Sequence, residues 1–312
     1  MAKRLILSSG ERKPLAQPEA GLCVTLLPGL RSVLAENPSP MTGPGTTTYL
    51  LGEGEVTLID PGPAGPGHLQ AILAALAPGE RITAILVTHP HLDHSALAPA
   101  LAAATGAPVY GFGAAGTARS ALMAHLAAQG LRGPEGVDQA FRPDILLRDG
   151  EILKTTAGPL IALHTPGHMA EHLCFGWQGQ LFCGDLIMAW APSLVSPPEG
   201  DMGDYMASLQ RLQGQGWQRL FPAHGAVIDD PASRIAELLA HRLAREAQIL
   251  TALAGLGQGD LNAILPLVYA TTPEALWPAA KRNLLAHLAD LVARGRVEAE
   301  DWPSEYARFR RR

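Results

Sequence analysis

The chain has 312 residues, of which 24 are basic and 29 acidic, giving a formal net charge of −5. Its hydrophobic content of 47 % and charged content of 17 % are typical of a compact globular protein and exclude a disordered, collagen-like or coiled-coil chain. The net negative charge gives no sign of a general binder of nucleic acid or of an anionic membrane.

The first 230 residues mix short strands with helices. Runs of β-branched and other apolar residues predict strands over 23–27, 47–51, 55–60, 82–88, 158–164, 173–177, 181–183 and 217–221. Helical spacing of apolar residues predicts helices over 69–76, from 95 and over 204–212. Residues 95–118 carry no formal charge, but prolines and glycines interrupt them, so we expect a buried helix, turn and strand and no membrane span. The pattern predicts a layered α/β domain over residues 1–230.

The character of the chain changes after residue 230. An amphipathic stripe predicts a helix over 232–254, a second helix from 260 and a third over 274–294, followed by a short hairpin or wing. Residues 231–312 carry 11 basic against 9 acidic side chains. We therefore expect a small, mostly helical second domain over residues 231–312 that resembles a winged helix.

The cysteine count and the amino terminus bear on the compartment. Three cysteines cannot form an even disulfide framework, which favours a reducing environment. The apolar run Leu5–Leu7 is too short for the core of a signal peptide. Both observations indicate a cytoplasmic protein.

The most informative stretch places four metal-binding side chains within six residues, just after a predicted buried strand: His89, His91, Asp93 and His94. The chance occurrence of such a pattern is on the order of one in a thousand for a chain of this length. Three further strand ends carry possible ligands. His164 and His168 follow one strand, Asp185 follows another and His224 follows a third. Because α/β sheets gather their chemistry at the carboxyl ends of strands, we expect these groups to meet in two adjacent metal sites. Imidazoles and carboxylates suit zinc, with iron or manganese as alternatives.

Taken together, these motifs resemble those of the metallo-β-lactamase superfamily, whose fold is an αββα sandwich. The resemblance implies one metal ion held by His89, His91 and His168, a second by Asp93, His94 and His224, and Asp185 bridging the two. Asp60 corresponds to an early aspartate that orients a ligand histidine. His172 is expected to support the ligands or to pack beside them.

Three segments, 37–46, 204–209 and 279–288, narrow the resemblance to the lactamase-beta-like protein 2 group, which carries a winged-helix carboxyl domain. The resemblance covers about residues 22–300 and departs from the common pattern at Ser95, Ala96 and Ala223, where glycines are frequent.

Two metal ions sharing a water would generate a bridging hydroxide at neutral pH, with Asp93 and Asp185 as catalytic groups. The leading hypothesis is therefore a dinuclear zinc hydrolase acting on an ester, thioester or similar small acyl substrate. The alternative is an endoribonuclease or phosphodiesterase, in which Lys281, Arg282, Arg294 and Arg296 would grip single-stranded RNA. A metal-binding regulator without activity would predict the loss of a ligand, and all seven are present.

Overall fold

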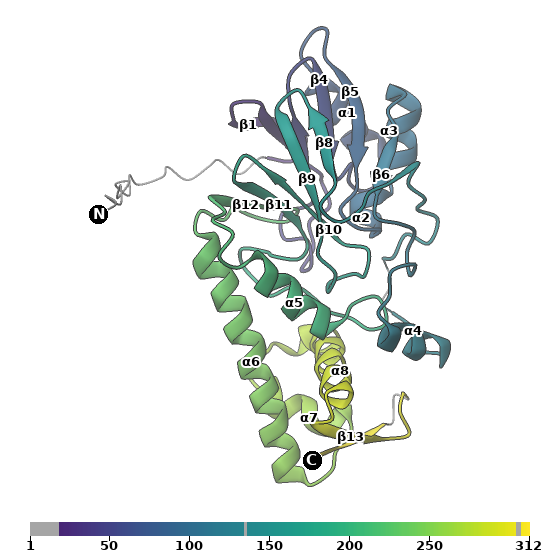
Figure 1. Ribbon diagram of the computed structural model, residues 1–312, viewed down its shortest axis with the longest axis vertical. Helices are drawn as coiled ribbons and strands as arrows, with labels where there is room; N and C mark the ends of the chain where they lie inside the picture. Colours follow the sequence, from purple (N-terminus) through teal and green to yellow (C-terminus); the bar gives the residue numbers. More distant parts are fainter. Residues whose placement is uncertain (1–18, 134–135, 304–306) are drawn as a thin grey trace, which may run out of the picture.

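Two β-sheets lie face to face at the centre of the computed structural model, which describes residues 19–133, 136–303 and 307–312 (Figure 1). The larger sheet runs in chain order from β1 to β7, and the smaller has the order β12-β11-β10-β9-β8. The strands of the larger sheet are β1 (Cys23–Leu27), β2 (Leu30–Leu34), β3 (Thr47–Leu51), β4 (Glu55–Ile59), β5 (Arg81–Leu86), β6 (Val109–Gly111) and β7 (Ile145–Leu146). Those of the smaller sheet are β8 (Ile152–Thr155), β9 (Gly158–His164), β10 (Leu173–Trp177), β11 (Gln180–Gly184) and β12 (Arg219–Pro222). The run at residues 5–7 lies outside the described residues.

Aromatic side chains fill the space between the sheets. The ring of Tyr49 on β3 lies 5.2 Å from that of Phe182 and 5.8 Å from that of Phe221, both on the opposite sheet. Helices cover the outer faces. On the larger sheet these are α1 (Pro66–Ala74) and α3 (Ala98–Thr105), and on the smaller sheet α5 (Met202–Leu212) and the first part of α6 (Pro231–Leu256). The expected αββα architecture is confirmed.

The sequence pattern missed several short elements. Strands β2 (Leu30–Leu34), β7 and β8 and helices α2 (Leu92–Ser95) and α4 (Ala121–Ala128) were not predicted. The uncharged stretch over 95–118 forms helix α3, a turn at Gly106 in the left-handed region (φ 72°) and strand β6, as expected. None of the helices in the described residues is long and apolar enough to cross a membrane.

The carboxyl-terminal part is a winged helix, as predicted. It contains α6, α7 (Leu261–Val268), α8 (Trp277–Ala293) and the hairpin of β13 (Val297–Glu300) and β14 (Arg308–Arg311). The Asp230 and Asp260 side chains accept hydrogen bonds from the first-turn amides of α6 and α7. The helix expected over 274–294 is divided, because a 3-10 turn at Glu274–Leu276 precedes α8 and Pro278 occupies the first turn of α8.

Helix α6 belongs to two cores. Its first half packs Ile235 and Leu238 against β11 and α5, whereas its second half packs Ile249 and Leu253 against α7 and α8. The helix therefore connects the sandwich rigidly to the winged helix, and the two parts lie one above the other along it (Figure 1).

The directions of the strands place the predicted metal-binding residues at one edge of the sandwich. Strands β4 and β5 run parallel in one sheet, and β11 and β12 run parallel in the other. Their carboxyl ends meet on the side of the sandwich that faces the winged helix. The polar residues following these strands therefore lie close together.

Candidate metal centre

A first group of four donors lies at the ends of β5, β9 and β11, and consists of His89, His91, His168 and Asp185. The Nδ1 atom of His91 lies 2.9 Å from His89 Nε2 and 3.1 Å from His168 Nε2. Asp185 Oδ2 lies 3.7 Å from His168 Nε2 and 4.0 Å from His89 Nε2. Four converging atoms of this kind can hold a divalent metal ion.

A second group lies beside the first and consists of Asp93, His94 and His224. Asp93 Oδ2 lies 3.5 Å from His94 Nε2 and 3.3 Å from His224 Nε2. Asp93 and His94 come from α2, which begins directly after the loop that carries His91, so one short segment supplies both groups.

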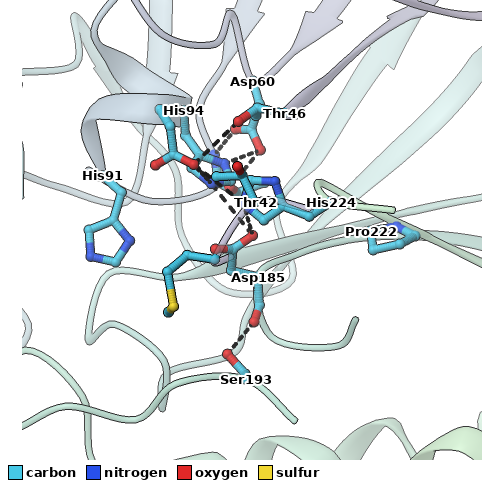
Figure 2. A network of polar contacts seen from close by, with 12 residues as sticks. Thr42, Thr46, Asp60, His91, His94, Asp185, Ser193, Pro222 and His224 are labelled. Carbon is cyan, nitrogen blue, oxygen red and sulfur yellow. Dashed lines mark hydrogen bonds and ion pairs between the residues drawn. The ribbon is translucent and has the colours of Figure 1, made fainter. Parts of the chain in front are cut away.

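Asp185 faces both groups. Its Oδ1 atom lies 3.2 Å from His224 Nε2 and 3.5 Å from His94 Nε2, while its Oδ2 atom faces the first group (Figure 2). Asp185 Oδ1 and His94 Nε2 are buried and have no hydrogen-bond partner among the described residues. Buried polar atoms without partners are costly, so this pair fits a centre built to bind metal ions.

Asp60 orients His94 directly and His89 through the Thr88 hydroxyl. Its Oδ2 atom lies 2.9 Å from His94 Nδ1 and accepts a hydrogen bond from Thr88 Oγ1 at 2.8 Å. Thr88 Oγ1 in turn lies 3.0 Å from His89 Nδ1. Asp60 adopts a left-handed backbone conformation (φ 53°), a strained geometry for a residue other than glycine. This conformation directs the buried carboxylate toward the histidines.

Backbone carbonyls orient two further histidines. His168 Nδ1 lies 2.7 Å from the carbonyl oxygen of Leu194, and His224 Nδ1 lies 3.1 Å from that of Gly45. The Ser193 hydroxyl donates to the Asp185 carbonyl oxygen at 2.5 Å (Figure 2). The same hydroxyl lies 3.2 Å from His168 Nδ1. With Nδ1 engaged in this way, each imidazole directs Nε2 into the centre.

The winged helix holds the segment that performs this positioning. Arg242 of α6 donates to the Ser193 carbonyl oxygen, and Asn283 of α8 accepts a hydrogen bond from the Val195 amide at 3.0 Å. Asn283 also accepts from Arg242 Nη1 at 3.2 Å. The 193–195 segment is therefore fixed on one side by the carboxyl-terminal helices and on the other by His168 and Asp185.

The histidine donors of the two groups differ in the direction in which their pKa values are shifted. Burial and neighbouring imidazoles lower the pKa of His91 to about 3 and also lower that of His89, so both are neutral. For His224 the Asp185 and Asp93 carboxylates outweigh burial and raise the pKa to about 9. The pKa of His94 is raised as well, because burial is again outweighed, here by Asp93, Asp185 and Asp60. Metal binding to the second group therefore competes with protons.

A cavity of about 460 Å³ opens onto the donors. Its apolar wall comes from Met41, Met188, Leu194, Pro278 and Ala279, the last two belonging to α8. The winged helix thus supplies part of the cavity wall. Apolar walls with a few polar groups at one end are typical of small-molecule sites.

Other residues highlighted by the sequence have different positions. His172 is fully buried, and its Nε2 atom accepts a hydrogen bond from the Asp185 amide at 3.2 Å. His164 stacks on Phe112 with ring centroids 3.8 Å apart and takes no part in either donor group. The thiol of Cys183 is buried and donates to the Ile187 carbonyl oxygen, as expected for a core thiol.

Asp60 and His172 were predicted to support the ligands, but sequence reasoning missed the other groups that orient them. Thr88 carries the only direct signal, because it precedes the histidine motif on the same segment. Ser193, Arg242 and Asn283 lie far from the motifs in the sequence, and the carbonyl oxygens of Gly45 and Leu194 have no signature in side-chain identity.

Two family models match different parts of the chain. Residues 41–224 match the model of the metallo-beta-lactamase superfamily, and residues 261–302 match that of the beta-lactamase associated winged helix domain. A beta-lactamase-like protein 2 homolog from Drosophila melanogaster is 33 % identical over 85 % of this chain and 88 % of that protein. An atrochrysone carboxyl ACP thioesterase from Aspergillus chevalieri is 32 % identical over 85 % of this chain and 82 % of that protein.

Two solved structures are similar over nearly the whole chain. A beta-lactamase domain protein from Burkholderia ambifaria has a TM-score of 0.79 and 25 % identity, covering 95 % of each chain. A metallo-beta-lactamase family protein from Thermus thermophilus has a TM-score of 0.73 and 26 % identity, covering 92 % of this chain and 100 % of that chain.

Proposed function

The chain belongs to the metallo-beta-lactamase superfamily, and from this premise we propose that it is a dinuclear, zinc-dependent hydrolase of small thioesters or esters in the cytoplasm. The observation that carries the dinuclear assignment is Asp185, whose two carboxylate oxygens face two separate donor groups. The thioester assignment is supported by the relatives named as thioesterases and by the apolar wall beside the donors. The cytoplasmic assignment agrees with three cysteines that form no disulfide.

We assign His89, His91 and His168 to one ion, Asp93, His94 and His224 to the other, and Asp185 to both. Two divalent ions bound there supply Lewis acidity and an activated water for attack on the acyl carbon. The chain's own residues position these elements. Asp60, His172 and Ser193 fix the orientation of the donors, and Met41, Leu194 and Ala279 exclude solvent from the acyl group.

Asp93 is suited to handle the proton. Its side chain is 28 % exposed, compared with 11 % for Asp185, and it lines the cavity. Its Oδ2 atom accepts a hydrogen bond from Thr46 Oγ1 at 3.3 Å, which holds the carboxylate in place. A carboxylate so placed can take the proton of the attacking water and pass it to the departing thiolate, which leaves as a thiol.

No specific observation favours the RNA alternative. Arg294 pairs with Glu246 at 2.6 Å and Asp290 at 2.7 Å, and Arg296 lies 3.9 Å from Glu246. Arg282 donates to Ser196 Oγ at 2.7 Å and to backbone carbonyl oxygens. These basic side chains are bonded within the protein, so they do not form a free cationic surface for phosphates.

One panel of assays tests the proposal. The protein would be loaded separately with zinc and with iron and supplied with thioesters, esters, lactones, a phosphodiester and single-stranded RNA. We expect thioesters or esters to give the highest kcat/KM. Cleavage of RNA or the phosphodiester with no acyl hydrolysis would refute the proposal.

A further inference from the structure

A second cavity, of about 230 Å³, lies beside the metal-centre cavity, between the 188–194 segment and helices α6 and α8. Met41, Met188, Leu194 and Ala279 line both cavities, so these side chains lie where the two cavities adjoin. Methionine side chains adapt readily to a bound group, so a substrate at the metal centre can extend into this space. We call this second cavity the arginine cavity, because Arg242 and Arg245 line the part of its wall that is not shared with the metal-centre cavity.

Both guanidinium groups lack a carboxylate partner within 4.0 Å in the described ranges. Arg242 is only 2 % exposed, and its hydrogen bonds go to two neutral oxygens, the Ser193 carbonyl and Asn283 Oδ1. Arg245 donates to the Val268 carbonyl oxygen and to Gln248 Oε1. Buried cations are normally paired with anions, so the buried Arg242 beside the half-buried Arg245 leaves an unbalanced positive charge at this cavity.

The nearby acidic residues are engaged elsewhere. Glu237 pairs with Arg234 at 2.8 Å, and Glu246 pairs with Arg294 at 2.6 Å. Aromatic rings support the arginines without neutralising them, with Tyr205 5.0 Å from the Arg242 guanidinium and Tyr269 4.1 Å from that of Arg245. His241, which also lines the cavity, has its pKa lowered to about 4 by burial and by the two arginines. The cavity is therefore electropositive.

We propose that the arginine cavity binds an anionic group of the substrate, a carboxylate or a phosphate, that an apolar stretch separates from the scissile acyl bond. This inference rests on the proposed acyl hydrolysis and adds a substrate class to it. The apolar residues shared by the two cavities contact the stretch, and Arg245, the more exposed of the two arginines, contacts the anion. A guanidinium suits the planar oxygens of either anion.

The test compares substrates matched in size. Glutaryl and valeryl thioesters of N-acetylcysteamine differ in a terminal carboxylate on the acyl side. Valeryl-phosphopantetheine and valeryl-pantetheine differ in one phosphate on the thiol side. We expect the anionic member of one pair to have a kcat/KM about 10- to 100-fold higher, the range typical of a hydrogen bond to a charged group. The pair that shows the preference identifies the source of the anion.

Variants connect the preference to the cavity. Arg245→Met keeps the packing on Tyr269 and should abolish the preference while leaving hydrolysis of the neutral thioester within about twofold. Arg245→Lys keeps the charge and should retain most of the preference. Arg211→Gln, which removes a charge on α5 from a side chain that is 41 % exposed, is the control and should change nothing. Equal rates within both pairs, or a preference that survives Arg245→Met, would overturn the inference.

A binding measurement separates this inference from the proposed function. Calorimetric titration with the glutaryl and valeryl amides of cysteamine, and with coenzyme A, needs no turnover. Tighter binding of an anionic ligand, lost in Arg245→Met, supports the cavity assignment even if no thioester is hydrolysed. Equal binding of the glutaryl and valeryl amides, with no binding of coenzyme A, refutes it even in an active thioesterase.

Discussion

Asn283 offers a way to weaken the metal centre from the winged helix without touching a ligand. Its Oδ1 atom accepts hydrogen bonds from the Val195 amide at 3.0 Å and from Arg242 Nη1 at 3.2 Å. Asn283→Ala leaves both donors unsatisfied, which should lower the free energy of unfolding by about 1–3 kcal/mol. The 193–195 segment would loosen, and with it the 2.7 Å contact between Leu194 and His168 Nδ1. Loss of such supporting contacts typically weakens metal affinity about 10- to 100-fold.

Competition with a fluorescent zinc chelator measures this affinity directly. Asn283→Asp keeps an acceptor for both donors and should retain zinc affinity within about threefold of the unsubstituted protein. Asn262→Ala, on the exposed face of α7, is the matched control and should leave affinity and melting temperature unchanged. Unaltered zinc affinity in a folded Asn283→Ala protein would refute the idea that the carboxyl-terminal helices position the metal ligands.

Three further predictions concern the bridge, the domain boundary and acid stability. Asp185→Asn removes a negative charge whose attraction to a metal ion roughly 4 Å away is worth about 4 kcal/mol. We therefore expect activity to fall more than about 100-fold and the metal content to drop. Activity retained within threefold would remove Asp185 from the bridging role. We propose residues 1–230 and 231–312 as the two domains. Limited proteolysis should then cut near 225–260 or nowhere. Early cleavage within 80–185 would contradict that division. Burial lowers the pKa of His68 to about 4, and because an unfolded histidine titrates near 6.5, the unfolded chain binds the extra proton between these values. The free energy of unfolding, measured with urea, should therefore fall by up to about 3 kcal/mol from pH 6.5 to pH 4. An equal fall in the His68→Gln variant would show that His68 is not its cause.

The sequence predicted the layered fold and the winged helix because their elements carry strong local signals. After Arg81, β5 is an uncharged run rich in β-branched residues, and the buried residues of α6 form an apolar stripe. Two of the missed strands, β7 and β8, lie at sheet edges, and β7 exposes both of its residues, so little burial pattern exists to be detected. Strand β2 is internal and largely buried, but Arg31 and Ser32 interrupt its apolar run. Tertiary pairing, not local preference, defines such strands.

The donor residues were predictable because one compact motif carries four of them and the others follow strand ends. Of the residues that orient them, the family resemblance indicated Asp60 and His172, but not those near the winged helix. The contacts of Ser193, Arg242 and Asn283 depend on how α6 and α8 dock onto the 193–195 segment, which is a property of the folded arrangement. Helix α5 turns Met202 and Tyr205 into the core beneath the smaller sheet, whereas Met188 lines the cavity.

The central claim is that two metal ions act together on an acyl bond. The most direct test titrates zinc into the chelated protein while bound metal and thioester hydrolysis are measured on the same samples. The account predicts that activity rises with metal content and saturates at about two ions per chain. Saturation at one ion, or hydrolysis that persists after complete chelation, would contradict it.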